Sequence, residues 1–218
     1  MLDRRVVVFD LDGCILDSTE PILACHNAAL AQFGLEPISR HDIARYIGPP
    51  LQDTVAGILA ERGKSDDLVE PLVEAYRSRY LPTSIDLAVA YDGIPELLVE
   101  LAREERLAVC TSKASVYAVP ILEHLGLDRH FETITGPPLS PPEPKVDTLG
   151  RAIEALSPFD RASSVMIGDR HHDIEAARHH GLVPVGVTWG FGSRNELEEA
   201  GASVIVDTPV ELAGTLGR

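Results

Sequence analysis

Short apolar runs alternate with amphipathic stretches along most of the chain. The runs are rich in β-branched residues and mostly uncharged, which is typical of strands buried on both faces. They are Arg5 to Phe9, Leu107 to Thr111, Ser164 to Ile167, Val183 to Val187 and Val204 to Val206. Between them, apolar residues recur at helical spacing in Ile94 to Glu104, Val116 to Leu125, Asp147 to Leu156 and Asp173 to His180. This alternation predicts an α/β fold, a doubly wound (Rossmann-like) parallel sheet with helices on both faces.

One interval breaks this alternation. From Leu16 to Pro82 we find no convincing strand, and the apolar residues follow helical spacing, as in Leu68, Leu72, Val73 and Tyr76. We therefore expect an inserted all-helical subdomain at residues 16–83, with an α/β core formed by residues 1–15 and 84–218. Pro49 and Pro50 predict a rigid turn inside the insertion, because proline has a fixed φ and no backbone N–H.

The composition restricts the class of protein. Of the 218 residues, 44% are hydrophobic and 24% are charged, as in folded soluble proteins. The formal charge of −15 repels phosphate backbones, so we expect no nucleic-acid polymer as a partner. No apolar run reaches the roughly 18 residues of a membrane span, and the N-terminus has no cleavable signal pattern. Three scattered cysteines favour a reducing compartment, so a cytoplasmic protein without membrane association is expected.

Two acidic side chains follow the first predicted strand. Asp10 and Asp12 occupy positions i and i+2, so they project from the same side at the carboxyl end of the strand, where open α/β sheets bind ligands. Two like charges crowded in this way indicate a bound cation or a shared proton. The Asp-x-Asp-Gly pattern also occurs in calcium loops and ordinary turns, so it does not establish a site alone.

A second acidic cluster follows another predicted strand. Asp169 comes directly after the Ser164 to Ile167 run and Gly168, and Asp173 follows at the start of a helix. Because parallel strands share one carboxyl edge, we expect Asp10, Asp12 and Asp169 to converge on one ion. Oxygen ligands without cysteine or an obvious histidine pair favour Mg²⁺. Asp173 fits equally well as a further member of this cluster or as the cap of its helix.

Hydroxyl groups and lysines supply the positive polarity that a phosphate group requires. Thr111 and Ser112 end a third predicted strand, and Lys145 follows a proline-rich loop at residues 136–144. Hydroxyls and backbone amides bind phosphoryl oxygens, and a lysine neutralises their charge. Lysine is rare in this chain, which makes Lys145 the stronger candidate. Lys113 fits better as a solvent-exposed lysine at the start of a helix.

These residues together resemble the haloacid dehalogenase-like phosphatases. The resemblance rests on four motifs that occur in order, namely Phe9-Asp10-Leu11-Asp12-Gly13, Thr111-Ser112, Lys145, and Gly168-Asp169 with Asp173. The helical insertion is similar to the small cap of that family. Three segments resemble the branch of phosphoglycolate phosphatases and related nucleotidases: Ile47 to Leu51, Thr111 to Lys113 and Ile121 to Leu127. Two features depart from the family pattern, Cys14 after the first motif and the form of Pro141 to Pro144 before Lys145.

The resemblance implies a mechanism. Asp10 would attack the phosphoryl group of a small phosphomonoester and form an aspartyl-phosphate that water hydrolyses. Asp12 would act as general acid and then as general base. Mg²⁺ would be bound by Asp10, Asp169 and the backbone carbonyl of Asp12, which leaves the Asp12 side chain available for proton transfer.

The resemblance also assigns roles to the remaining candidates. Thr111, Ser112 and Lys145 would bind the phosphate, and Lys145 would also be catalytic. Gly13 and Asp173 would support the site. The substrate would be selected by three residues of the cap, Tyr46, Gly48 and Pro49.

Several alternatives stay open. The substrate is expected to be phosphoglycolate, with a nucleoside monophosphate as the alternative. A phosphosugar mutase uses the same pair of aspartates, and a catalytically silent binding module is conceivable on any fold. A halide-removing dehalogenase is disfavoured because Asp12 stands beside the nucleophile. The oligomeric state, monomer or dimer, does not follow from the sequence.

Paired histidines flank the last motif. His171-His172 and His179-His180 could indicate a transition-metal site. Adjacent residues on a helix point in different directions, so we expect these side chains to face solvent instead.

Overall fold

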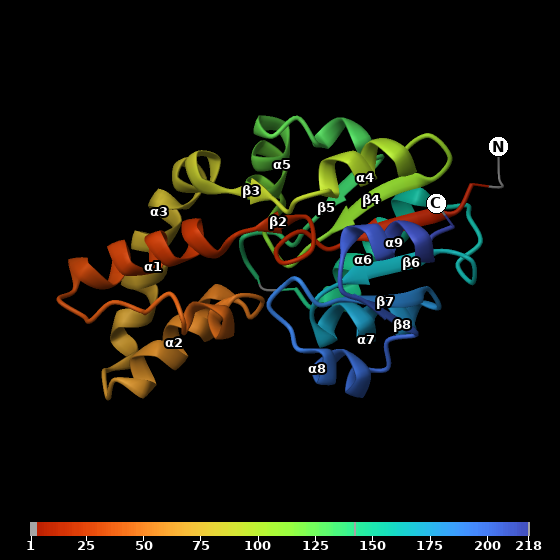
Figure 1. Ribbon diagram of the computed structural model, residues 1–218. Coiled ribbons are helices and arrows are strands. Elements are labelled where there is room, and N and C mark those ends of the chain that lie inside the picture. The colour runs from red at the N-terminus through yellow and green to blue at the C-terminus, as the bar shows by residue number, and fades with distance from the viewer. Residues whose placement is uncertain (1–3, 142, 218) are drawn as a thin grey trace. The chain divides into compact units, whose positions relative to one another are not determined.

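A six-stranded parallel sheet forms the core of the molecule (Figure 1). The computed structural model describes residues 4–141 and 143–217. The strand order is β5-β4-β1-β6-β7-β8. The strands are β1 (Val6–Phe9), β4 (Arg106–Cys110), β5 (Thr133–Thr135), β6 (Val165–Gly168), β7 (Val183–Val187) and β8 (Val204–Val206). The predicted α/β class with a parallel sheet is confirmed.

Helices follow the strands along the chain. They are α4 (Ile94–Leu101), α5 (Ser115–His124), α6 (Lys145–Leu156), α7 (His171–His180), α8 (Arg194–Ala200) and α9 (Pro209–Thr215), with a short 3₁₀ turn at Asp128–His130. The sequence pattern did not predict β5, α8 or α9, because short elements with few apolar residues carry little periodic signal. The proline-rich loop lies between β5 and α6, and its Pro142 is outside the described residues.

The core lies on both faces of the central strand β1. Val6 and Val8 pack with Met166 of β6 and with apolar residues of α6 and α7 in one cluster. Successive side chains of a strand alternate between the two faces, so Val7 and Phe9 point the other way. They are fully buried as well. This burial on both faces explains why β1 is an unbroken apolar run.

A two-stranded antiparallel ribbon marks the chain's departure from the core and its return. In this ribbon β2 (Leu16–Asp17) pairs with β3 (Val89–Ala90). The expectation of no strand between Leu16 and Pro82 is therefore wrong at its first two residues. A two-residue strand has no measurable period, and only its partner, distant in sequence, defines it.

The residues between these two strands form a separate helical unit, Ser18–Ala88. Its helices are α1 (Thr19–Gln32), α2 (Leu51–Glu61) and α3 (Val69–Leu87), with 3₁₀ turns at Ile43–Tyr46 and Asp66–Leu68. The expected limit at residue 83 falls inside α3, which continues to Leu87. Helices α1 and α3 pack together, with the rings of His26 and Tyr76 at 4.6 Å between centroids. Within the described residues, no helix is long and apolar enough to cross a membrane.

Candidate active site

The candidate residues of the core meet at the carboxyl edge of the sheet. The register pairs Phe9 with Val109 on one side and with Ile167 on the other. The backbone N–H of Asp10 donates to the Ile167 carbonyl at 2.8 Å, which extends the ladder by one residue. Side chains that follow β1, β4 and β6 are therefore brought to the same edge, although they are far apart in the sequence.

Three carboxylates form a buried acidic cluster at this edge. One oxygen each from Asp10, Asp169 and Asp173 lies within 4.8 Å of the others, and the side chains are almost fully buried. The ammonium group of Lys145, the first residue of α6, forms an ion pair with Asp10 and another with Asp173, the latter at 2.8 Å. One lysine faces three carboxylates, so the cluster carries an excess of negative charge.

The electrostatics of this cluster favour a cation. Burial raises the pKa of Asp10 to about 7, Lys145 opposes this shift, and Asp173 adds to it. Burial raises the pKa of Asp169 well above its ordinary value, and the neighbouring Asp10 and Asp173 contribute in the same direction. The pKa of Lys145 is held well above its usual range because the attraction of Asp10 and Asp173 outweighs the opposing effect of burial. A divalent cation would relieve the repulsion among the three acids.

The environment of Asp169 fits such a cation. Its Oδ2 accepts a hydrogen bond from the backbone N–H of Phe191 at 2.7 Å. Its Oδ1 is buried and has no hydrogen-bond partner in the part of the chain that the structure describes. A buried carboxylate oxygen without a donor is costly unless something else satisfies it. Hard oxygen ligands of this kind fit Mg²⁺.

Asp12 and Lys113 form a second charged pair in the site. The Lys113 Nζ donates to Asp12 Oδ1 at 2.6 Å. Lys113 is only 9% exposed, and it precedes α5, which begins at Ser115. The expectation of a solvent-exposed lysine at a helix start is therefore wrong. The sequence did not reveal this contact, because the two residues are 101 positions apart.

The hydroxyl residues after β4 occupy different environments. Thr111 is buried, and its Oγ1 accepts a hydrogen bond from the Lys113 backbone N–H at 3.0 Å. The hydroxyl hydrogen of Thr111 stays available to donate to a phosphoryl oxygen. Ser112 is exposed next to it. The role of both residues in phosphate binding stays a prediction.

Asp173 combines the two roles that the sequence left open. It is the third residue of α7, which begins at His171 after the N-cap Arg170. Its Oδ2 accepts from the Arg170 backbone N–H at 3.1 Å, as in a capping box, and its Oδ1 faces Lys145. Asp173 therefore holds both the start of α7 and the ammonium group of Lys145.

A glycine-rich segment after β7 completes the surroundings of Asp169, and the sequence reasoning missed it. The segment is Trp189-Gly190-Phe191-Gly192. A Cβ at Gly190 would lie 2.3 Å from the Gly13 carbonyl oxygen, and one at Gly192 would lie 1.9 Å from the Asp169 carbonyl oxygen. Only glycine permits this close approach. Two glycines within five residues of the end of a buried strand, at the edge that holds the other candidates, are a signal that could have indicated this segment.

The first motif is held close to this segment. Gly13 has a φ of +88°, and a Cβ there would lie 2.2 Å from Asp169 Oδ2. The Trp189 Nε1 donates to the Cys14 carbonyl oxygen at 3.1 Å. Cys14 therefore offers its backbone to this loop, while its side chain is fully buried.

Tyr46, Gly48 and Pro49 belong to the helical unit, where the Tyr46 hydroxyl donates to Glu61 Oε2 at 2.7 Å. The expectation that adjacent histidines point apart is wrong for His171 and His172, whose ring centroids are 3.7 Å apart. His171 occupies the first turn of α7, where Glu196 draws its ring toward α8.

Comparison with known proteins identifies the family. The sequence profile of the haloacid dehalogenase-like hydrolases matches residues 7–187. The chain belongs to this family. A solved haloacid dehalogenase-like hydrolase from Streptococcus pneumoniae superimposes with a TM-score of 0.88 at 27% identity, over 99% of both chains. The predicted family and the predicted enzyme class, a hydrolase of the phosphatase type, are confirmed.

Relatives within this haloacid dehalogenase-like family carry different names. One, from Mycobacterium tuberculosis, is named tyrosine-protein kinase PtkA and is 36% identical over 98% of this chain and 72% of its own length. A 5'-nucleotidase from Pseudomonas aeruginosa is 35% identical over 88% of this chain and 86% of its own. A phosphoglycolate phosphatase from Agrobacterium fabrum is 33% identical over 85% and 81%, respectively. Sequence similarity thus leaves the substrate open.

Proposed function

We propose that this protein is a Mg²⁺-dependent phosphomonoesterase that acts on a small phosphorylated metabolite through an aspartyl-phosphate intermediate. The observation that carries the proposal is the convergence of Asp10 with Asp169, Asp173 and Lys145 at one buried edge of the sheet. A carboxylate held beside a buried ammonium group and next to an unsatisfied acidic oxygen is suited to receive a phosphoryl group.

The cation would be held by the carboxylates of Asp10 and Asp169 and by the Asp12 backbone carbonyl. When bound, Mg²⁺ would neutralise charge on the phosphoryl oxygens and on the acidic cluster. Lys145 holds Asp10 in place and offsets part of its negative charge, and Asp173 orients Lys145 from the other side. Thr111 would donate a hydrogen bond to the phosphoryl group.

The chemistry takes place in two steps. An oxygen of Asp10 forms a bond to phosphorus while the ester bond to the leaving oxygen breaks, and Asp12 donates the proton that this oxygen needs. In the second step water attacks the aspartyl-phosphate, Asp12 accepts a proton from that water, and inorganic phosphate leaves. Lys113, bonded to Asp12 Oδ1, fixes the orientation of this carboxyl group in both steps.

A direct test measures phosphate release from p-nitrophenyl phosphate with and without Mg²⁺. We expect turnover only with the metal, and the Asp10→Asn variant is expected to lose roughly a thousandfold or more of kcat. Asp10→Asn with wild-type activity contradicts the nucleophile assignment. If the folded wild type with Mg²⁺ hydrolyses none of the phosphomonoesters tested, the protein is a binding module instead.

We propose 2-phosphoglycolate as the substrate, on the similarity to the relative from Agrobacterium fabrum and on the segments that resemble that branch. A 5'-nucleotidase is the alternative, on the similarity to the relative from Pseudomonas aeruginosa. A steady-state screen of phosphomonoesters ranked by kcat/KM distinguishes the two. Turnover that requires a bisphosphate activator indicates a mutase. The name of the mycobacterial relative implies, for that protein, the transfer of a phosphoryl group from ATP to protein tyrosine. This transfer is measured in the same screen.

Under this proposal, the helical unit acts as a cap whose loop at residues 46–51 selects the leaving group. Tyr46 is tied to Glu61 inside the unit, so its ring is more suited to shape the loop than to take part in chemistry. Pro49→Ala is expected to change the ratio of kcat/KM between 2-phosphoglycolate and a nucleoside monophosphate. An unchanged ratio argues against a selecting role of this loop.

A further inference from the structure

A group of nitrogen and oxygen donors lies on the first turns of α7. One ligand atom from each of His171, His172 and Glu175 lies within 4.8 Å of the others. Residues three and four apart share one side of a helix, which brings Glu175 close to both histidines. Ligand bonds to Zn²⁺ are roughly 2.0–2.2 Å long, so rotations of the half-buried His172 and the exposed Glu175 would bring their ligand atoms to one ion beside His171.

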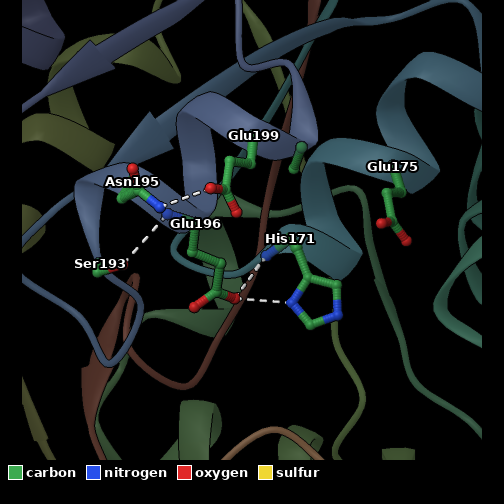
Figure 2. A pocket seen from close by; sticks show the side chains of 7 residues that line it. His171, Glu175, Ser193, Asn195, Glu196 and Glu199 are labelled. Carbon is green, nitrogen blue, oxygen red and sulfur yellow. Dashed lines mark hydrogen bonds and ion pairs between the residues drawn. The ribbon is translucent and has the colours of Figure 1, made fainter.

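The ring of His171 is held by Glu196 of α8 through its Nδ1. Its Nδ1 lies 2.7 Å from Glu196 Oε1, and its backbone N–H donates to the same oxygen at 3.0 Å (Figure 2). Arg170 Nε adds a further hydrogen bond to this oxygen at 2.8 Å. A carboxylate beside Nδ1 keeps the proton on that nitrogen and leaves the lone pair on Nε2. This arrangement accompanies metal-bound histidines in many proteins.

Two of the donors, His171 and Glu175, border a pocket that is open to solvent. It is lined by residues of α7 and of α8 with its N-cap, namely His171, Glu175, Ser193, Asn195, Glu196, Glu199 and Ala200. Figure 2 shows the carboxylates of Glu175, Glu196 and Glu199 in this region, with the His171 ring between Glu196 and Glu175. Several carboxylates around one pocket attract cations.

We propose that His171, His172 and Glu175 bind a divalent transition-metal ion such as Zn²⁺, at a site separate from the acidic cluster. Imidazole nitrogens are suited to Zn²⁺, Cu²⁺ and Ni²⁺, whereas Mg²⁺ prefers oxygen ligands. The Mg²⁺ of the proposed reaction does not compete for this site. A bound ion would tie the first turns of α7, which also carry Asp173, to Glu196 on α8 through the His171 ring.

The test measures Zn²⁺ binding by calorimetry with the full chain, purified without a polyhistidine tag and kept in millimolar MgCl₂ to occupy the oxygen site. The variants are His172→Gln, Glu175→Gln and Glu196→Ala. The matched control is His179→Gln, which removes an exposed histidine from the other pair on the same helix. The three cysteines are buried and do not provide a competing site at the surface.

We expect one Zn²⁺ to bind to the wild type and to His179→Gln with equal affinity. His172→Gln and Glu175→Gln, which each lose a ligand, and Glu196→Ala, which loses the acceptor that orients His171, are each expected to weaken binding about tenfold or more. With CuCl₂, electron paramagnetic resonance is expected to show two coupled nitrogens in the wild type and one in His172→Gln. No Zn²⁺ binding by the wild type, or equal affinity in His172→Gln and His179→Gln, overturns the proposal.

Discussion

Lys113 and Asp12 form an ion pair at 2.6 Å between the loops that follow β4 and β1. Both side chains are largely withdrawn from solvent, with 5% of the Lys113 side chain and 17% of the Asp12 side chain exposed. A charged hydrogen bond in such surroundings is stronger than one at the surface and fixes the geometry of both partners. The proposed proton carrier therefore has a positioning residue.

Replacement of this lysine is expected to impair proton transfer more than substrate binding. Lys113→Met should lower kcat by about a hundredfold, as expected for a misplaced general acid, with a smaller change in KM. The loss should be greater for an alkyl phosphate than for p-nitrophenyl phosphate, because a poor leaving group depends more on the proton. Steady-state kinetics with both substrates provide the measurement, and Lys64→Met at an exposed position is the control. Equal activity of the two variants contradicts the role of Lys113.

The excess of negative charge around Asp169 is expected to lower the stability of the protein when no Mg²⁺ is bound. Asp169→Asn retains an acceptor for the Phe191 N–H and removes one buried negative charge. Without Mg²⁺ this variant should be more stable than the wild type by about 1 kcal/mol, which corresponds to about 2–4 °C in Tm for a chain of this size. Mg²⁺ should raise the Tm of the wild type and not that of the variant. Thermal unfolding by circular dichroism in EDTA and in Mg²⁺ measures both effects.

The control for this comparison is Glu123→Gln, which removes an exposed acid on α5. It should leave the Tm in EDTA and the shift with Mg²⁺ unchanged. A Tm of Asp169→Asn in EDTA well below that of the wild type shows that the acidic cluster is not under electrostatic stress.

The close contact at Gly190 predicts that a larger side chain at this position disturbs the site. A methyl group there would lie 2.3 Å from the Gly13 carbonyl oxygen and 2.4 Å from Asp169 Oδ2, so Gly190→Ala must displace one of the two loops. We expect a loss of about 1–3 kcal/mol of stability and weaker Mg²⁺ binding, because Asp169 moves with its loop. Urea unfolding and Mg²⁺ titration measure the two effects. Gly214→Ala in α9, where nothing lies within 4 Å, should be neutral or slightly stabilising.

The buried histidine of the helical unit makes the chain sensitive to acid. Burial lowers the pKa of His26 to about 4, below its ordinary value of 6.5, so the folded protein binds a proton less readily than the unfolded chain. Stability that His26 contributes above pH 6.5 is therefore lost as the pH falls toward 4. The loss between pH 7 and pH 5 is about 2 kcal/mol. His26→Leu should remove this part of the pH dependence.

Urea unfolding of the wild type and of His26→Leu at both pH values measures this difference. His41→Leu serves as the control, because His41 is exposed in the same unit and should leave the pH dependence as it is in the wild type. If His26→Leu loses as much stability as the wild type between pH 7 and pH 5, another group is responsible for the acid sensitivity.

The sequence by itself determined the parallel sheet and the place of its carboxyl edge. β1 is buried on both faces, so every position of Val6–Phe9 is apolar. This local pattern can be recognised in the sequence without knowing which strands lie beside β1. Asp10 and Asp169 follow two such runs directly. Their convergence could be predicted because parallel strands necessarily end at one edge.

Only the tertiary structure decided which side chains meet at that edge and beside it. Lys113 and Asp12, or Gly190 and Gly13, are brought together by contacts between loops distant in sequence, and no local periodicity records such a contact. β5 and α8 were missed because short elements depend on their neighbours for stability. The direction of the His171 ring likewise depends on the tertiary structure. It is set by Glu196 on α8 rather than by the position of His171 on α7.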